Sequence, residues 1–285
     1  HGAPSGPVTV ANSTVAIDVL HPTRRAEGIG FYGLSNNIAT AISPSVALWI
    51  YHTTNNYDLI FLLAVVVSFI GFAVSSTVKI PPKEIVKDKQ PISLDRFFLY
   101  SAWKVSVSLL CLAFSYGVLS TYVAIYGQEE LGITGGTGFF FMLLAIGLIL
   151  ARLAGSKSLR EGKVIKNAGI GCLISLCGFF LFAALHNGIG YYGAAFIIGI
   201  GNGHMFPAYQ TMFLNLAEHS QRGTANSSHL VSWDVGVGLG ILAGGFISRH
   251  LGYHEAFWTA WLVNLIGVLC FFFIVKKFFL THKLR

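Results

Sequence analysis

Charged residues are scarce in this chain of 285 residues. Asp, Glu, Lys and Arg make up 11% of it, whereas about 25% is usual in soluble globular domains. Hydrophobic residues account for 54%, and the mean hydropathy is +0.64. This balance excludes an ordinary soluble domain and indicates an integral membrane protein.

Motifs of metal sites, redox pairs and common enzymes are also missing. The four cysteines lie in apolar runs without a CxxC pair, so we expect small buried side chains there. No HExxH, GxSxG or phosphate-loop pattern occurs, and no second histidine stands at metal-ligand spacing from His204. We expect no metal, no cofactor and no enzymatic activity. A polytopic membrane enzyme is kept as the alternative from another class.

Long uncharged runs predict transmembrane helices. Residues 59–78 and 256–275 each supply the length of about 20 residues that a spanning helix needs. Strands of a membrane barrel would alternate apolar and polar residues over about 10 positions, and these runs do not. The predicted fold class is therefore all-α, with nine segments at roughly 1–20, 28–51, 57–78, 98–126, 136–154, 164–186, 190–217, 224–250 and 254–277.

Basic residues follow one side of this topology. All of the 19 lysines and arginines except Arg249 fall on connections that alternate to the same side, or on the C-terminus. The positive-inside rule makes that side cytoplasmic and places the C-terminus there. The formal charge of +7 is then a topology signal, and we expect no nucleic-acid partner.

An internal repeat is suggested when the sequence is shifted by 197 residues, which aligns Arg25 with Arg222 at the start of two long apolar runs. A stripe of small residues recurs at every fourth position in both copies: Ala39, Ser43 and Ala47 in the first, and Gly236, Gly240 and Gly244 in the second. Such stripes let helices approach closely, so we expect both to pack on neighbouring helices. Chance similarity between two apolar helices is the alternative.

The repeat predicts how the chain is divided. Residues 1–80 are expected to be the remainder of an N-terminal half, 81–97 a central cytoplasmic loop, and 98–285 a six-helix C-terminal half. By this period the first copy begins roughly 100 residues before residue 1, which is enough for three helices. We therefore expect nine helices of a twelve-helix protein, with its first three missing. Two six-helix halves are a transporter architecture.

Several stretches resemble the major facilitator superfamily. Residues 17–33 are similar to its fourth helix, cytoplasmic turn and fifth helix, with Asp18 and Arg25 in the usual acidic and basic places. Residues 155–163 resemble its loop signature, except that leucine stands where aspartate is expected. Residues 199–211 are similar to the tenth helix. The resemblance implies transport by alternating access.

The run 39–48 is similar to a degraded signature of proton antiporters, in which Pro44 is kept and the glycines are replaced. This resemblance implies proton-coupled efflux of a small organic solute by a monomeric, multi-pass protein of the bacterial inner membrane. Its partners would be the lipid bilayer, a small-molecule substrate and protons. Proton-coupled uptake of a sugar or metabolite is the rival, and a channel or receptor is a third class.

Asp234 is an isolated acid in the apolar run 231–246. It follows Arg222 by 12 residues, about 18 Å along a helix, which is near the middle of a bilayer. A charge at that depth costs about 2.5–3.5 kcal/mol on insertion scales, and a water-filled cavity would reduce this cost. Asp234 is thus a candidate for proton coupling or substrate binding, with a helix-locking hydrogen bond as the alternative. Asn36 and Asn37 lie at the repeat-related position as candidate cavity residues, or as interhelical contacts.

Further candidates lie where glycines and a proline loosen the run 199–211. They are His204, Asn202, Tyr209 and Gln210, followed by the tyrosines of 115–126, which are Tyr116, Tyr122 and Tyr126. Each of these could line a cavity or simply pack against a neighbouring helix.

A cytoplasmic gate is the last candidate site. Asp18, Arg25 and Arg222 lie at the expected cytoplasmic mouth, near Gly155 and Arg160 of the loop signature. They would form a latch that favours one access state. The alternative is a solvated turn that obeys the positive-inside rule.

Overall fold

The computed structural model describes residues 53–77, 98–133 and 135–284 continuously, together with scattered positions between 8 and 51. The expected central loop, 81–97, lies outside the described residues, and so does much of the segments 1–20 and 28–51. The division of the chain into halves therefore stays a prediction.

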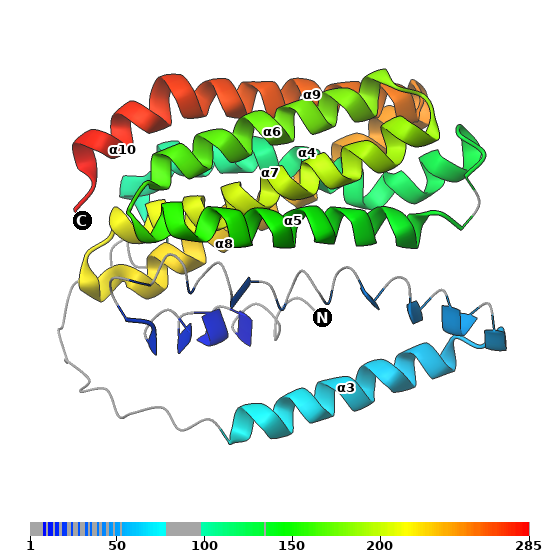
Figure 1. The fold of residues 1–285 in the computed structure, drawn as a ribbon, viewed down its shortest axis with the longest axis horizontal. Helices are drawn as coiled ribbons and strands as arrows, with labels where there is room; N and C mark the ends of the chain where they lie inside the picture. The colour runs from blue at the N-terminus through cyan, green and yellow to red at the C-terminus, as the bar shows by residue number, and fades with distance from the viewer. Residues whose placement is uncertain are drawn as a thin grey trace.

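All regular structure in the described residues is helical, which confirms the all-α fold class (Figure 1). Each segment expected from residue 57 onward corresponds to one long helix, and the last continues through a π-helical turn. The elements are α3 (Asp58–Ser76), η3 (Tyr100–Ala102), α4 (Trp103–Glu129), α5 (Thr137–Arg160), α6 (Val164–Ala184), α7 (Gly188–Asn215), η4 (His219–Gln221), α8 (Arg222–His250), α9 (Tyr253–Cys270), η5 (Phe271–Val275) and α10 (Lys276–His282). The count of nine spans stays a prediction.

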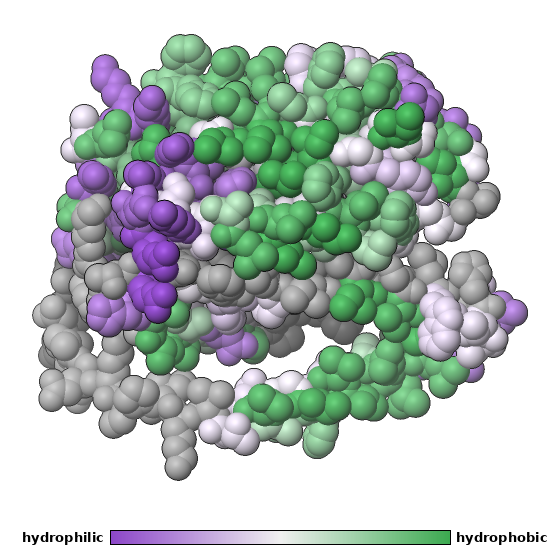
Figure 2. Space-filling model, in the orientation of Figure 1, coloured by the Kyte–Doolittle hydropathy of each residue, from purple (hydrophilic) through white to green (hydrophobic). Residues whose placement is uncertain are grey.

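Six helices of the described chain are long and apolar enough to cross a membrane. Figure 2 shows hydrophobic side chains over the middle of the bundle and hydrophilic ones gathered toward its two ends. This distribution is what a bilayer requires of a protein that crosses it several times.

Helix α7 lies at the centre of the bundle, packed between α5 and α6 and touching α8. Glycines allow this close packing. A Cβ at Gly199 would overlap the carbonyl oxygen of Leu144 on α5, and a Cβ at Gly201 would lie 2.6 Å from the backbone nitrogen of Ser175 on α6. Interfaces of small residues are typical of membrane helices, where backbone approach replaces hydrophobic burial.

Helix α8 packs on α4 along its small-residue stripe. A Cβ at Gly236 would lie 2.5 Å from the carbonyl oxygen of Leu110, and one at Gly240 would overlap the carbonyl oxygen of Phe114. Gly244 faces the ring of Tyr122. In the repeat-related stripe, Ala39 and Ser43 are exposed and Ala47 is half-buried. Close packing there stays a prediction, and Pro44 lies outside the described residues.

Candidate functional site

A cavity of about 620 Å³ lies where α4, α5, α7 and α8 face residues of the first 35 positions. Its lining from the four helices is Tyr116, Phe141, Leu144, Ala145, Leu148, Arg152, Asn202, Phe206, Gln210, Leu230, Trp233 and Asp234. Its lining from the first 35 positions is Thr9, Asn12, Ser13, Tyr32, Gly33 and Ser35. Both sequence regions that the repeat assigns to different halves therefore contribute to one cavity.

Asp234 lies in the wall of this cavity, and its side chain is exposed there. The preceding residue, Trp233, packs its ring against those of Tyr116 at 5.6 Å and Phe206 at 5.3 Å, measured between ring centroids. The acid therefore sits beside an aromatic wall built from α4, α7 and α8. The opposite, glycine face of α8 packs on α4, which leaves Asp234 directed toward the open space.

A chain of hydrogen bonds joins α7, α8 and the N-terminal region at the edge of the cavity. The side-chain amide of Gln210 donates to Asn226 Oδ1 at 2.7 Å, and Asn226 Nδ2 donates to Ser13 Oγ at 2.6 Å. All three side chains are buried, and so is that of the lining residue Asn202. Asn202 and Gln210 were expected on sequence grounds. Asn226 and Ser13 were not, because a single amide or hydroxyl in the sequence carries no distinctive pattern.

Arg152 lines the cavity, although its place in the sequence predicted a cytoplasmic connection. Counted with the basic residues of a cytoplasmic connection, it is in fact buried, with 6% of its surface exposed. The reason is that α5 continues to Arg160, beyond the expected end at 154. Arg152 therefore lies about 12 Å inside the helix end. Its guanidinium group approaches Gly33 so closely that a Cβ there would overlap Arg152 Nη1.

His204 does not line the cavity. Its Nδ1 lies 3.2 Å from Asn167 Oδ1 on α6, and a Cβ at Gly155 of α5 would lie 2.7 Å from the same nitrogen. The histidine therefore occupies the contact between α5, α6 and α7. Gly155, expected at the gate, provides the space for this imidazole ring.

Three expected tyrosines also lie outside the cavity. Tyr209 is fully buried and bonds Ser108 Oγ at 2.7 Å. Tyr122 donates to the carbonyl oxygen of Ile241 at 2.7 Å. Tyr126 is packed in an aromatic cluster, with its ring centroid 4.9 Å from that of Phe257. These hydroxyls and rings serve helix packing in this structure, whereas Tyr116 faces the cavity.

The gate residues are only partly described. Arg160 is exposed at the end of α5, and Arg222 is half-buried at the start of α8. Asp18 and Arg25 lie outside the described residues, and so do the candidate cavity residues Asn36 and Asn37. A latch between these groups stays a prediction. Within the described part of the chain, no three His, Cys, Asp or Glu side chains come together as a metal site would require.

Comparisons with known proteins identify the family. The model of the Major Facilitator Superfamily matches residues 1–233. The staphylopine export protein of Staphylococcus aureus (strain Mu50 / ATCC 700699) is 23% identical over 275 residues, which cover 92% of this chain and 67% of that protein.

Two solved structures share the fold. The human organic anion transporter MFSD10 (TETRAN) superposes with a TM-score of 0.72 at 13% identity, covering 92% of this chain and 67% of that one. FucP, in the outward conformation, gives a TM-score of 0.65 at 14% identity, covering 97% and 72%. The helical bundle, its apolar belt and the family match agree: the chain belongs to the major facilitator superfamily, a family of multi-pass membrane transporters rather than enzymes.

Proposed function

We propose that this chain is part of a proton-coupled exporter that moves a small organic solute by alternating access. The observation that carries the proposal is the cavity of about 620 Å³, which contains both Asp234 and Arg152. Cavities of about 300–1,000 Å³ accommodate small-molecule ligands. Efflux is supported by the distant relative whose name describes an export protein.

The chemistry of the lining suggests what the solute carries. Arg152 presents a guanidinium group, which suits a carboxylate or another planar anionic group. Trp233, Tyr116 and Phe206 offer flat apolar surfaces beside it. Asn202 and Gln210 add amide groups that fix orientation. We therefore propose an organic solute with an anionic group and an apolar or aromatic part.

Asp234 is the proposed coupling residue. It is the acidic side chain in the cavity lining, at a depth where a free carboxylate is costly. Proton uptake neutralises it, and opening of the cavity to water on the other side of the membrane would favour release, because hydration stabilises the carboxylate. Antiport further requires that the proton and the solute occupy the cavity in turn.

The same cavity suggests how access would alternate. Its walls come from residues 9–35 and from α4, α5, α7 and α8, which we assign to the two halves, 1–80 and 98–285. Rocking of one half against the other would open the cavity to one side at a time. Breaking the bond of Asn226 to Ser13 would accompany such a motion.

The test uses purified protein in liposomes that hold a pH-sensitive dye. Pools of organic acids are screened for solute-dependent proton movement, whose sign gives the direction of coupling. Asp234→Asn should abolish the pH change, whereas the control Glu255→Gln, an exposed acid in the first turn of α9, should retain it. Arg152→Gln should raise the half-saturating concentration about tenfold or more, since an ionic hydrogen bond contributes about 1.5–3 kcal/mol. A pH change that survives in Asp234→Asn would refute Asp234 as the coupling acid.

A further inference from the structure

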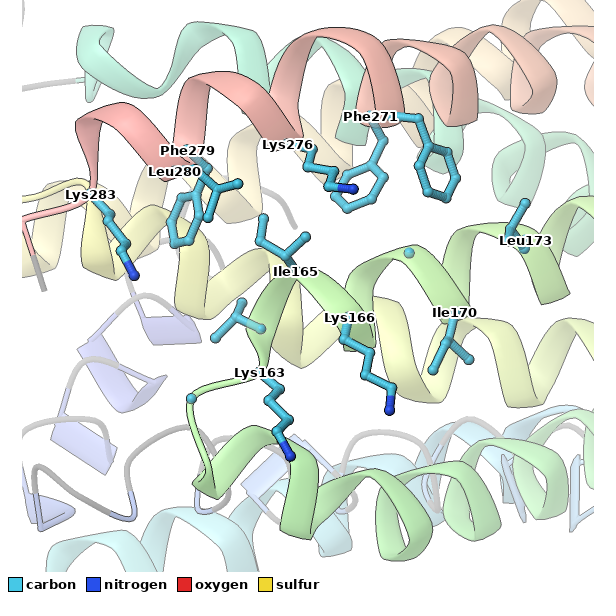
Figure 3. Close-up of a pocket in the computed structure, with 14 residues that line it drawn as sticks. Lys163, Ile165, Lys166, Ile170, Leu173, Phe271, Lys276, Phe279, Leu280 and Lys283 are labelled. Carbon is cyan, nitrogen blue, oxygen red and sulfur yellow. The ribbon is translucent and has the colours of Figure 1, made fainter.

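A second concave site lies at the end of the bundle where α10 ends, on its outer surface. It is a groove of about 550 Å³ between the start of α6 and the segment formed by η5 and α10 (Figure 3). Its lining is Gly162, Lys163, Val164, Ile165, Lys166, Gly169, Ile170, Leu173, Phe271, Phe272, Lys276, Phe279, Leu280 and Lys283. It shares no residue with the central cavity.

The inner part of the groove is apolar and open to the surroundings of the bundle. Ile170, Leu173 and Leu280 are 37%, 48% and 54% exposed. Its floor is close-packed, because a Cβ at Gly169 would lie 3.4 Å from the ring of Phe271. Exposed apolar side chains on a membrane-spanning helix face acyl chains, so this part of the groove can hold a hydrocarbon chain.

Helix geometry brings lysines from two elements to this groove. After the π-helical turn, Lys276 and Leu280 are four residues apart and share one face of α10, and Lys283 follows directly at the end of this helix. Figure 3 shows Lys276 and Lys283 extending from α10 toward α6. Lys163 and Lys166 lie at the start of α6.

The charged side chains that line the groove are all basic. Lys163 donates to Glu161 Oε2 at 2.6 Å, so its charge is partly balanced. Among the described residues, no ion pair is found for Lys166, Lys276 or Lys283, and no acid lines the groove. The first turn of α6 also lacks an acid. A lysine at the positive end of a helix dipole is unfavourable unless an anion is nearby.

We propose that this groove binds an anionic phospholipid. The phosphate of its headgroup would lie among Lys166, Lys276 and Lys283, and an acyl chain would follow Ile170 and Leu173 into the apolar part. Basic pockets between membrane helices beside an apolar surface suit such lipids. Cationic groups at one end and an exposed apolar strip at the other match both parts of one amphipathic molecule.

The proposal is tested with full-length protein purified in a neutral detergent and titrated with phosphatidylglycerol, with bound lipid counted by native mass spectrometry. Lys166→Gln combined with Lys276→Gln should weaken binding about tenfold or more, since each basic residue near an anionic lipid contributes strongly. The matched control combines Lys157→Gln with Lys277→Gln, which removes the same charge at exposed positions outside the groove. All four lysines are exposed, so none of these substitutions should disturb folding.

The control pair should bind phosphatidylglycerol as the unaltered protein does. In both of these proteins, phosphatidylcholine should bind at least tenfold more weakly than phosphatidylglycerol, and this preference should be reduced in the Lys166→Gln, Lys276→Gln variant. Equal weakening in both double variants would overturn the proposal, because only general surface charge would then be involved. Displacement of the lipid by inorganic phosphate at equal concentration would also overturn it, since the site would then recognise a free anion rather than a phospholipid.

Discussion

A comparison of α3 with α7 shows that the more apolar of these two helices is the less buried one. Helix α3 is the most apolar of the six helices that can cross a membrane, yet none of its described residues is buried. Helix α7 is not among those six, yet buried residues occur along almost its whole length. It carries Asn202, Gln210 and Thr211 among them.

The physical reason is that the bilayer stabilises apolar side chains only where lipid contacts the helix. A helix enclosed by other helices meets protein on every side, so its polar groups can find hydrogen-bond partners and its glycines can admit neighbouring backbones. Hydropathy therefore detects helices that have a side facing lipid, including α4, α5 and α8 of the cavity, whereas the most enclosed helix, α7, scores as less suited to the membrane. Polar residues of such a helix either line a cavity, as Asn202 and Gln210 do, or bond to neighbouring helices, as Tyr209 does.

The largest expected effect comes from enlarging a glycine of α7, with a glycine of α3 as the comparison. Gly199→Leu should force α5 and α7 apart, because the new side chain would overlap the backbone carbonyl of Leu144. Overpacking of this kind costs about 3 kcal/mol or more. Gly71→Leu in α3 should be neutral, because no atom lies within 4 Å of a Cβ there.

The measurement for these two glycine variants is the yield of monodisperse protein in detergent, together with its melting temperature. Similar losses in the two variants would show that α3 is as closely packed as α7, and the contrast between the helices would fail.

Replacing a polar residue by leucine should likewise destabilise the protein when the residue is in α7 but not when it is in α3. Gln210→Leu would remove the donor to Asn226, whose side chain is fully buried. The resulting loss of stability should be about 1–3 kcal/mol. Ser68→Leu in α3 is the matched change at an exposed position and should cost nothing measurable. The measurement is the melting temperature of each variant. If Gln210→Leu melts at the temperature of the unaltered protein, this hydrogen bond contributes little to stability.

The smallest expected effect concerns a hydroxyl group on α7 that faces away from the cavity. Ser108 donates to the carbonyl oxygen of Gly267, so the Tyr209 hydroxyl must donate to Ser108. Tyr209→Phe should lower stability by about 1 kcal/mol, which is the usual contribution of an interhelical hydrogen bond in a membrane protein. Transport in liposomes should be unchanged. Impaired transport at unchanged melting temperature would place this hydroxyl in the solute pathway instead.

Several features of the molecule could be predicted from the sequence. The scarcity of charge and the long apolar runs indicate membrane helices, because uncharged apolar runs of about 20 residues match the thickness of a bilayer. The position of Asp234 along its helix, 12 residues after Arg222, also followed from the sequence, because α8 begins at Arg222. The motifs in 17–33 and 155–163 indicated the family.

The direction of each side chain around its helix could not be predicted. Tyr209 and Gln210 are neighbours in the sequence and point about 100° apart, so only one of them reaches the cavity. The pattern of α7 shows that Asn202, Phe206 and Gln210 share a stripe, but not which neighbouring helix each stripe meets.

The sequence by itself determined the class of protein and the helices from residue 57 onward, because these depend on composition and on local geometry. The tertiary structure alone decided which polar residues form a site. Arg152 looked like part of a basic connection until the length of α5 and the position of Gly33 placed it in the cavity. His204 looked like a cavity residue until Gly155 and Asn167 enclosed its ring. Contacts between distant segments determine such placements, and no local pattern encodes them.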